Sequence, residues 1–381
     1  MPKLAVRNSN WARIAASAAL LWAMPFGHAK GLGELIGPAG ATPSACKTAH
    51  LEAATPVLID DVFPDVLDQT PGRNHGSRQL FKPIREIGEP LGKLGSACLA
   101  QDLPSCERFA SWVEALARAD ALRFDREKHR AKPASFVTGT LAGNVTLRPI
   151  ALYTGLLLER QQIEFADAAL VKRWLRQRAR DYEHAPRVPR TMLAQNIVLN
   201  SALTQQAVGL ATGDAALARR ASEIYKAYID TMREDGSFPE ETQRGQSALK
   251  YTNMAIGALV MTAELAAVSG VDLYSYRGSS GDLHKAVGFL LDALDDESKI
   301  AGYAAAGVTP TDPPQPDGRQ ARGFLKSHMG WVQAFMARFP AHVNTPFLRA
   351  LVRASSSAQA HDIDESLGVM PSCIFGPVHA R

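Results

Sequence analysis

The sequence predicts an all-α protein in which antiparallel helical hairpins stack on one another. Three observations lead to this fold class. Apolar residues recur with a helical period from about residue 81 to residue 339, short turn signals separate the runs, and no convincing alternating strand is present. Because short loops join helices that lie side by side, consecutive helices are expected to pack antiparallel. About 260 residues are enough for one large core without a second domain.

Apolar residues at the spacing i, i+3, i+4 and i+7 mark the individual helices in chain order. The clearest runs are Phe109, Trp112, Val113 and Leu116, then Leu217, Ala221, Ile224, Tyr225, Tyr228 and Met232, then Leu283, Val287, Leu290, Leu291 and Leu294. Turn-forming residues lie between such runs, at 102–104, 185–189, 213–214, 235–236 and 269–270. The β-branched stretch 145–147 is short, and we expect it to lie within a buried helix.

Residues 1–29 have the pattern of a secretory signal peptide. A basic start precedes an apolar run at 14–26 that is too short to span a bilayer comfortably, and small residues follow at 27–29. The basic residues are Lys3, Arg7 and Arg13. No later segment is expected to span a membrane, because Glu264 interrupts the most apolar helix. We therefore expect a periplasmic or secreted protein with no membrane contact after cleavage.

Composition divides the rest of the chain into three parts. Residues 30–80 are rich in Pro, Gly and Asp, and we expect an irregular arm that wraps the body or forms a lid over a groove. Residues 81–345 form the helical domain. Residues 346–381 form a C-terminal tail with little helix, whose end is expected to be loose unless Cys373 anchors it.

Net charge gives no reason to expect a nucleic acid or a membrane surface as partner. The formal charge of +4 falls to +1 when the three basic residues of the signal peptide are removed with it. The basic stretch at 172–180 has its charges spread around a helix, so we expect a solvated helix face there.

The four cysteines are expected to form disulfides, because an exported chain meets oxidising conditions. Cys98 and Cys106 flank a short loop and are the obvious local pair. Cys46 and Cys373 remain, and a bond between them would tie the N-terminal arm to the C-terminal tail. No Cys-x-x-Cys and no zinc-like ligand spacing is present, so we expect no metal and no cofactor.

Arg244 and Tyr251 are the most informative pair in the chain. They lie seven residues apart, ahead of a long apolar run. In a continuous helix this spacing would place both side chains on one face, roughly 10 Å apart along the axis. A guanidinium can bind and neutralise a carboxylate while a phenol moves a proton, which suits chemistry on a carboxylated substrate.

The segment around this pair resembles the periplasmic alginate lyases, which are mannuronate-cleaving polysaccharide lyases with an incomplete (α/α) toroid fold. The family shows an acidic residue, a run with Arg and Gln, then Ala-Leu-x-Tyr, an Asn and a helix that ends near Gly-Val-Asp-Leu. The resemblance covers about two thirds of the chain, from about residue 81 to residue 339. The residues of this chain that match the family motif are Glu241, Arg244, Gln246, Ala248, Leu249, Tyr251, Asn253 and residues 270–273. The stretch 106–122 gives further support for the resemblance, and the stretches 139–143 and 331–339 give weaker support.

The resemblance implies a catalytic group of Asn196, Arg244 and Tyr251. The family carries an adjacent Asn-His pair, but here Ile197 follows Asn196 where the histidine is expected, and Thr252 follows Tyr251 where the family usually has another histidine. In the implied mechanism Arg244 and Asn196 neutralise the uronate carboxylate. Tyr251 takes the C5 proton and then protonates the C4 oxygen, since both lie on one side of a β-linked ring. A free tyrosine has a pKa of about 10, so a cationic neighbour is needed.

Five further residues are expected to bind substrate. Asn200 lies one turn after Asn196 and could face the groove in its place. Gln246 and Asn253 belong to the family-like segment, and His75 and Arg78 lie in a polar stretch that forms either a lid or a solvated loop.

Several of the residues named so far could instead have a purely structural role. Tyr251 could be a core tyrosine, Asn196 a helix cap or buried amide, His328 a helix-surface residue, and Trp112 and Trp331 core residues or sugar platforms, with core packing preferred.

Two functions from different classes follow from this pattern. The first is a polysaccharide lyase that cleaves a β-linked uronan of the mannuronan or glucuronan type by β-elimination, acting as a monomer on an acidic polysaccharide. The second is a catalytically impaired protein that binds or assembles exopolysaccharide, because Ile197 replaces the histidine. A glycoside hydrolase is a third, weaker option that would need the adjacent pair Glu240 and Glu241, whose side chains point apart on a helix.

Overall fold

The computed structural model describes most of the helical part of the chain. The described residues are 31–38, 40–46, 82–125, 133–183, 195–307, 328–355, 363–364 and 366–376. Within these residues every regular element is a helix, and the only β-type pairing is an isolated bridge between Asp364 and Val369. The predicted signal peptide at 1–29 and most of the predicted arm at 30–80 lie outside the described residues.

The helices follow one another along the chain, joined by connections of very different length. In chain order they are η1 (Leu32–Leu35), η2 (Ile84–Gly88), α2 (Glu89–Leu99), α3 (Leu103–Arg118), α5 (Pro133–Glu159), α6 (Ala168–Asp181), α7 (Gln195–Thr212), α8 (Ala215–Ile229), α9 (Pro239–Thr242), η4 (Gly245–Ser247), α10 (Ala248–Val268), α11 (Leu283–Asp295), α12 (Ser298–Ala306), α14 (Trp331–Arg338), α15 (Thr345–Ser355) and α16 (Pro371–Phe375).

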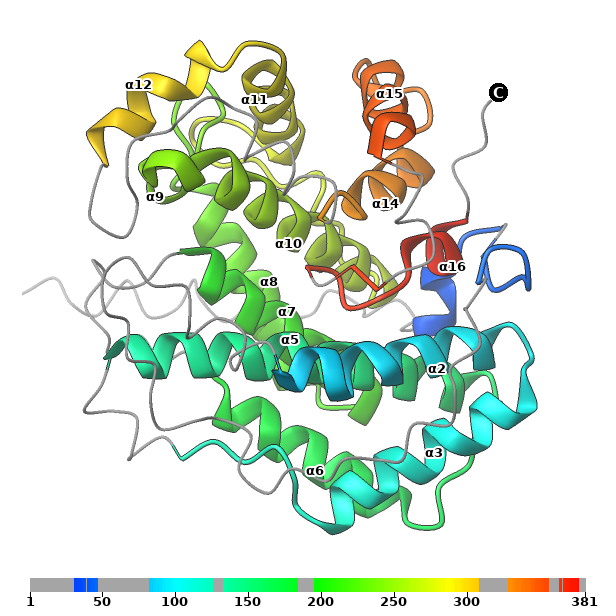
Figure 1. The fold of residues 1–381 in the computed structure, drawn as a ribbon. Coiled ribbons are helices and arrows are strands. Elements are labelled where there is room, and N and C mark those ends of the chain that lie inside the picture. The colour runs from blue at the N-terminus through cyan, green and yellow to red at the C-terminus, as the bar shows by residue number, and fades with distance from the viewer. Residues whose placement is uncertain are drawn as a thin grey trace, which may run out of the picture.

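The helices form a curved stack of neighbouring pairs rather than a closed ring. Helices α2 and α5 lie side by side across the middle of Figure 1, with α3 and α6 on one side of them. Helix α7 packs against α5, α6, α8 and α10, and α10 in turn packs against α11 and α14. This arrangement confirms the predicted all-α class and the predicted helical hairpins.

Aspartate side chains cap several of these helices, and Asp214 does so at a turn that the sequence predicts. The side chains of Asp167, Asp214 and Asp282 accept hydrogen bonds from backbone N–H groups in the first turns of α6, α8 and α11. Such bonds satisfy N–H groups that have no partner inside the helix, at a gain of about 1 kcal/mol each. The β-branched stretch 145–147 lies inside α5 with its backbone helical, which confirms the expectation of a buried helix.

Among the described residues, two helices are long and apolar enough to cross a membrane by length and composition. They cover Gly139–Glu159 and Gly245–Val268, and most of each window is buried inside the protein. The sequence predicts no membrane-spanning segment after the signal peptide, and buried core helices of soluble proteins have the same length and composition. Burial against neighbouring helices accounts for their composition.

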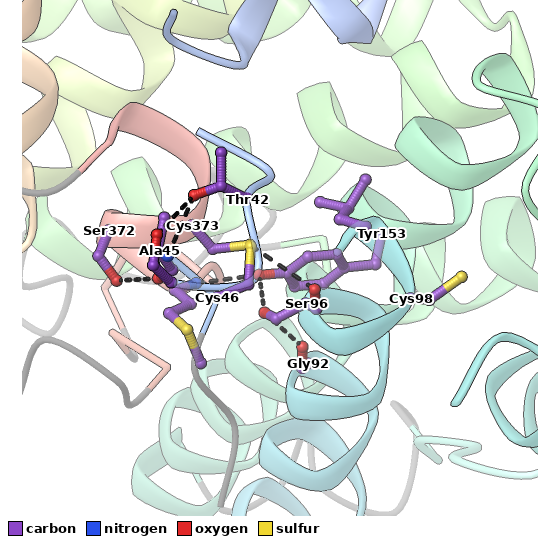
Figure 2. The surroundings of a disulfide bond; sticks show 12 residues. Thr42, Ala45, Cys46, Gly92, Ser96, Cys98, Tyr153, Ser372 and Cys373 are labelled. Carbon is purple, nitrogen blue, oxygen red and sulfur yellow. Dashed lines mark hydrogen bonds between the residues drawn. A yellow bond between two sulfur atoms is a disulfide. The ribbon is translucent and has the colours of Figure 1, made fainter. Parts of the chain in front are cut away.

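A disulfide joins the two ends of the described chain. Cys46 and Cys373 are bonded across a sequence separation of 327 residues, and both are buried. Around this bond Ala41 N donates to Cys373 O at 2.7 Å and Ser372 Oγ donates to Ala45 O at 2.8 Å. Figure 2 shows this bond beside Ser96 and Tyr153 of the helical body. The C-terminal segment around Cys373 is therefore anchored.

The second disulfide closes the short connection between α2 and α3. Cys98 and Cys106 are bonded across eight residues, as the sequence predicts. The tail beyond residue 345 carries the two short helices α15 and α16, and α16 is buried throughout.

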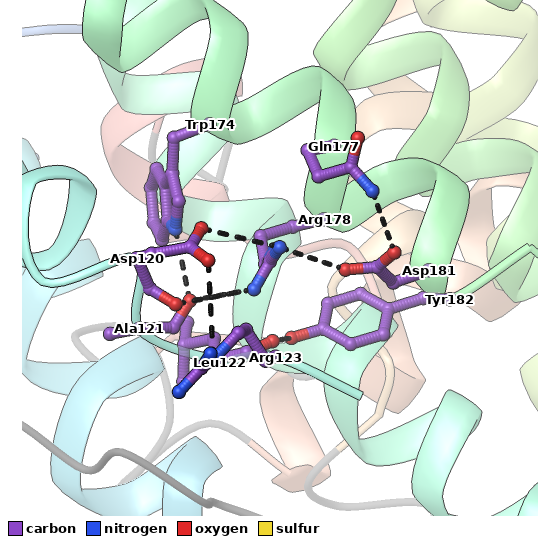
Figure 3. Close-up of polar contacts among 9 residues, drawn as sticks. All are labelled: Asp120, Ala121, Leu122, Arg123, Trp174, Gln177, Arg178, Asp181 and Tyr182. Carbon is purple, nitrogen blue, oxygen red and sulfur yellow. Dashed lines mark hydrogen bonds and ion pairs between the residues drawn. The ribbon is translucent and has the colours of Figure 1, made fainter. Parts of the chain in front are cut away.

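A buried arginine on α6 holds the loop that follows α3. Arg178 bonds Asp181 at 3.0 Å and Asp120 at 3.3 Å, and it also donates to the carbonyl oxygens of Asp120 and Ala121 at 3.3 Å. Tyr182 donates to the carbonyl of Leu122 (Figure 3). We call these six residues the Arg178 cluster.

The Arg178 cluster compensates for an unusual backbone. Asp120 and Leu122 have φ angles of +49° and +62°, in the left-handed region that non-glycine residues rarely occupy. Their carbonyls and that of Ala121 all accept side-chain bonds from α6. The solvated face expected at 172–180 is therefore wrong for Arg178, which is only 3% exposed.

Candidate active site

The segment that carries Arg244 and Tyr251 is a turn followed by a helix, not one continuous helix. Helix α9 ends at Thr242, Arg244 precedes the single turn η4, and α10 begins at Ala248. Gly245 has a φ of +48°, which bends the chain between the two side chains. The expected separation of roughly 10 Å along one helix face is therefore wrong.

The bend brings the arginine onto the tyrosine. The guanidinium carbon of Arg244 lies 4.1 Å from the centroid of the Tyr251 ring, and Lys250 Nζ lies 5.6 Å from the same centroid. All three side chains are half-buried. Tyr251 is thus not a core tyrosine: it lies half-buried at the start of α10, with two cations beside its ring.

A buried carboxylate links this pair to Asn196. Glu241 Oε1 accepts hydrogen bonds from the backbone N of Asn196 at 2.8 Å and from the hydroxyl of Tyr228 at 2.9 Å. Glu241 Oε2 accepts from Asn196 Nδ2 at 3.2 Å. We call Glu241, Asn196, Tyr228 and Arg244 the Glu241 cluster. It joins α7, α8, α9 and the turn before α10.

Burial dominates the electrostatics of this carboxylate. Desolvation raises the pKa of Glu241 to about 7, although the hydrogen bond from Tyr228, the charge of Arg244 and the bond from Asn196 N each lower it. The same burial and the nearby carboxylate raise the pKa of the Tyr228 hydroxyl well above its usual value. Glu241 therefore titrates near neutral pH, close to Arg244.

Asn200 has a structural environment. Its Nδ2 donates to Asn196 O at 2.8 Å and its Oδ1 accepts from Arg148 Nη2 at 2.8 Å. Arg148 is fully buried, and desolvation lowers its pKa to about 9 although the charge of Asp364 raises it. A second bond from Arg148 reaches Ser366 O, in the C-terminal segment. Asn200 supports Asn196 from below, and both of its amide atoms are engaged inside the protein.

Asn253 is also engaged inside the protein. Its Nδ2 donates to His328 O at 2.8 Å, and its Oδ1 accepts from Trp331 Nε1 at 2.8 Å. These bonds fix the start of α14 against α10. Trp331 and Trp112 are both buried, as preferred from the sequence.

His328 is not the helix-surface residue that the sequence suggests. It precedes α14 and is buried, with Nδ1 3.5 Å from Ser366 Oγ. Burial, with a smaller effect from the charge of Lys250, lowers the pKa of His328 to about 4. The ring is therefore neutral at pH 7.

The remaining candidates differ in what the structure says of them. Gln246 lies in η4, between Arg244 and Tyr251 in the sequence, and is half-buried. Ile197 is buried at 8% exposure, next to Asn196 in α7. His75 and Arg78 lie outside the described residues. Glu240 is exposed while Glu241 is buried, so these two carboxylates face different surroundings.

No metal centre is found in the part of the chain that the structure describes, because no group of three or more His, Cys, Asp or Glu side chains gathers there. Sequence reasoning missed Tyr228 and Arg148 as partners of the site. Tyr228 is part of an apolar helical run and reads as core. Arg148 lies in the apolar run of α5, and its position there was the one available signal of a buried charge.

Comparison with known proteins identifies the family of this chain. The sequence model of the alginate lyase family matches residues 109–300, just over half of the chain. A polysaccharide lyase of Stenotrophomonas maltophilia is 32% identical over 148 residues, which are 37% of this chain and 40% of the relative. An alginate lyase of Pseudomonas putida is 30% identical over 212 residues, which are 53% of this chain and 55% of the relative. The chain thus spans about half the length of the curated relatives it matches.

Solved structures share the fold over a larger part of the chain. Alginate lyase A1-III of Sphingomonas species A1 has a TM-score of 0.68 at 20% identity, covering 93% of this chain and 99% of that one. An alginate lyase of Bacteroides ovatus has a TM-score of 0.54 at 14% identity, covering 79% and 75%. These likenesses support the incomplete (α/α) toroid. The family match over residues 109–300 shows that this chain belongs to the alginate lyase family.

Proposed function

We propose that this protein is a polysaccharide lyase that cleaves a β-linked uronic-acid polymer by β-elimination. The observation that carries the proposal is the contact between the Arg244 guanidinium and the Tyr251 ring, 4.1 Å from its centroid, within a chain of the alginate lyase family. The proposal extends to the whole protein an activity that belongs, by name, to relatives matched over half their length.

Carboxylate binding is assigned to Arg244 and Asn196. Abstraction of the C5 proton places negative charge on the adjacent carboxylate, and charged or amide donors fixed beside it lower the barrier. Asn196 has one Nδ2 proton engaged by Glu241, and the second proton of the same nitrogen is assigned to the substrate. Gln246, half-buried at the edge of the site, is assigned to a neighbouring sugar.

Proton transfer is assigned to Tyr251. The phenolate takes the C5 proton, the C5–H electrons form the C4=C5 double bond, and the C4–O bond breaks. The phenol then returns that proton to the leaving oxygen, so the atoms balance without a second acid. Arg244 and Lys250 beside the ring stabilise the phenolate that starts the cycle.

The test is cleavage of purified uronans by the wild-type protein and by Tyr251→Phe. Polymannuronate, glucuronan and alginate are incubated separately, and the ultraviolet absorbance of the new C4=C5 bond is followed. Activity on at least one polymer, reduced about 10²–10⁴-fold by Tyr251→Phe at an unchanged melting temperature, is expected. Full activity in Tyr251→Phe would exclude Tyr251 as the proton carrier.

A second function is favoured by one observation, the buried Ile197 at the position of the family histidine. On this view the protein binds an acidic exopolysaccharide without cleaving it. Binding of a mannuronate tetramer with no absorbance change on any of the three polymers would support it. In either case we propose that the protein is exported and acts as a monomer on a polysaccharide outside the cytoplasm.

A further inference from the structure

Glu241 has no role in the proposed mechanism, yet its buried carboxyl lies close to the arginine that is assigned to the substrate. It is fully buried, it accepts three hydrogen bonds, and Arg244 acts on it electrostatically. In the proposed function Arg244 must also attract a uronate carboxylate. Two carboxylates would then share one guanidinium, at a site where water screens their repulsion poorly.

Like charges that share a buried site are relieved when one of them takes a proton. The substrate carboxylate has to stay ionised to bind Arg244, and a free uronate in water is a stronger acid than a buried glutamate. Glu241 is therefore the group that yields. Its protonated form still accepts from Asn196 N and Tyr228 at Oε1, because those two bonds use one oxygen.

The proton has a defined consequence for Asn196. Oε2 accepts from Asn196 Nδ2 when Glu241 is ionised. A proton on Oε2 would face that N–H group, so the Asn196 amide rotates and its Oδ1 accepts from the new O–H. Both protons of Nδ2 are then released for the substrate carboxylate.

We propose that Glu241 is a positioning residue that takes up one proton from solvent when a uronate carboxylate binds Arg244, and thereby turns the Asn196 amide toward the substrate. This inference rests on the proposed function for the nature of the ligand. The groups that face Glu241 are Tyr228 from α8, Asn196 from α7, Arg244 ahead of η4 and the exposed Glu240 beside it. Burial holds the pKa of the free carboxyl near 7, which makes uptake measurable at neutral pH.

Calorimetry of tetramer binding tests the uptake. A mannuronate tetramer is titrated into Tyr251→Phe protein, which does not turn it over, in two buffers of different ionisation enthalpy at several pH values. About half a proton is expected to enter per tetramer at pH 7, rising toward one at pH 8, because the free carboxyl is half-protonated near pH 7. Added Glu241→Gln should abolish the uptake. Adding Glu240→Gln removes a neighbouring charge that raises the pKa of Glu241, so the uptake should persist with its midpoint moved to lower pH.

Affinity separates this role from a purely structural one. Gln at position 241 mimics the protonated carboxyl, so at pH 8 the tetramer should bind Glu241→Gln several-fold more tightly than the parent. A residue that only holds the fold would give weaker binding. Tyr228→Phe supplies a second variant that keeps both Asn196 contacts. Its hydroxyl lowers the pKa of Glu241, so its removal should move the midpoint of uptake to higher pH.

Uptake that persists in Glu241→Gln, or a midpoint that moves to lower pH in Tyr228→Phe, overturns the inference. If Glu241→Gln does not fold, the Tyr228→Phe midpoint decides alone. Failure of the proposed function looks different. If the wild type cleaves a uronan but tetramer binding is not linked to proton uptake, only the proposed role of Glu241 is excluded. If proton uptake is linked to binding but no uronan is cleaved, only the proposed lyase activity is excluded.

Discussion

The Arg178 cluster and the Glu241 cluster both place an ionised side chain in the interior, yet they differ in how the charge is met. Arg178 has two carboxylates and two carbonyl oxygens around it, and all of these acceptors belong to the loop after α3 or to α6 itself. Glu241 has three donors and a guanidinium, but burial still raises its pKa to about 7.

The difference separates a cluster that stabilises the fold from a cluster that lies at the candidate active site. The Arg178 cluster fixes a loop whose backbone is in an unfavourable conformation, and its charge is balanced within the cluster (Figure 3). The Glu241 cluster ends in Arg244, which is half-buried at the edge of the protein, and its carboxyl titrates where enzymes operate. Perturbed acids of this kind cluster at functional sites.

The largest expected effect is on activity, from Arg244→Ala. It removes the charge that we assign to the substrate carboxylate, so turnover of the best uronan should fall about 10²–10³-fold. The free energy of unfolding should change by less than about 1 kcal/mol, because the side chain is only half-buried. Steady-state kinetics with urea unfolding checks both. A variant that keeps its turnover would remove Arg244 from the site.

The next effect is on the pH dependence of stability. Glu241 has a pKa of about 7 when folded and an ordinary value near 4.5 when unfolded. The contribution of the protonated Glu241 carboxyl to the free energy of unfolding is therefore complete below pH 4.5 and is lost as the pH rises through 7. The wild type should lose up to about 3 kcal/mol relative to Glu241→Gln across this window.

Urea unfolding of both proteins at pH 4.5, 6 and 7.5 measures that difference. Comparison with Glu241→Gln isolates one carboxyl from two other buried groups. Asp364, with a pKa raised to about 6, acts in the same direction, and His328, with a pKa lowered to about 4, acts in the opposite one. A difference that grows toward acid pH would mean that Glu241 is ionised throughout.

In the Arg178 cluster the effect should be on stability alone. Arg178→Met removes the donors of the strained loop and should cost about 2 kcal/mol, with Asp120 half in water and able to rehydrate. Lyase activity of the folded protein should be unchanged. Loss of activity at full stability would show that this cluster reaches the site.

The smallest effect is expected from Tyr182→Phe. It removes the hydroxyl that donates to Leu122 O and leaves one buried carbonyl without that bond, at a cost of about 1 kcal/mol. The same atom removed from Tyr251 should lower turnover about 10²–10⁴-fold without this loss of stability. The two tyrosine variants, measured side by side, are the sharpest test of the comparison.

Periodicity and turn chemistry were sufficient to predict the helical elements, because a helix that buries one face needs apolar residues at fixed spacing. Of the aspartate caps at 167, 214 and 282, only Asp214 lies at a turn that the sequence predicted. The pairing of Arg244 with Tyr251 was predicted for the wrong local reason, since Gly245 bends the chain between them.

The failures have a common physical origin. Burial of Arg178 depends on carbonyls that arrive from a loop more than fifty residues earlier in the chain, and burial of Arg148 depends on Ser366 in the C-terminal segment. No local pattern encodes such partners. His328 and Asn253 were misjudged for the same reason, because their bonds to each other and to Trp331 join α10 to α14.

The bond between Cys46 and Cys373 constrains the order in which disulfides can form during synthesis and folding. Ribosomes deliver Cys46 first and Cys373 last of the four cysteines, and in the interval the earliest thiol can meet only Cys98 and Cys106. Every nascent chain can therefore form a non-native disulfide between Cys46 and Cys98 or Cys106, and thiol–disulfide exchange is required to convert it to the native pairing. Cells that make this protein in quantity should depend on a disulfide isomerase to finish it.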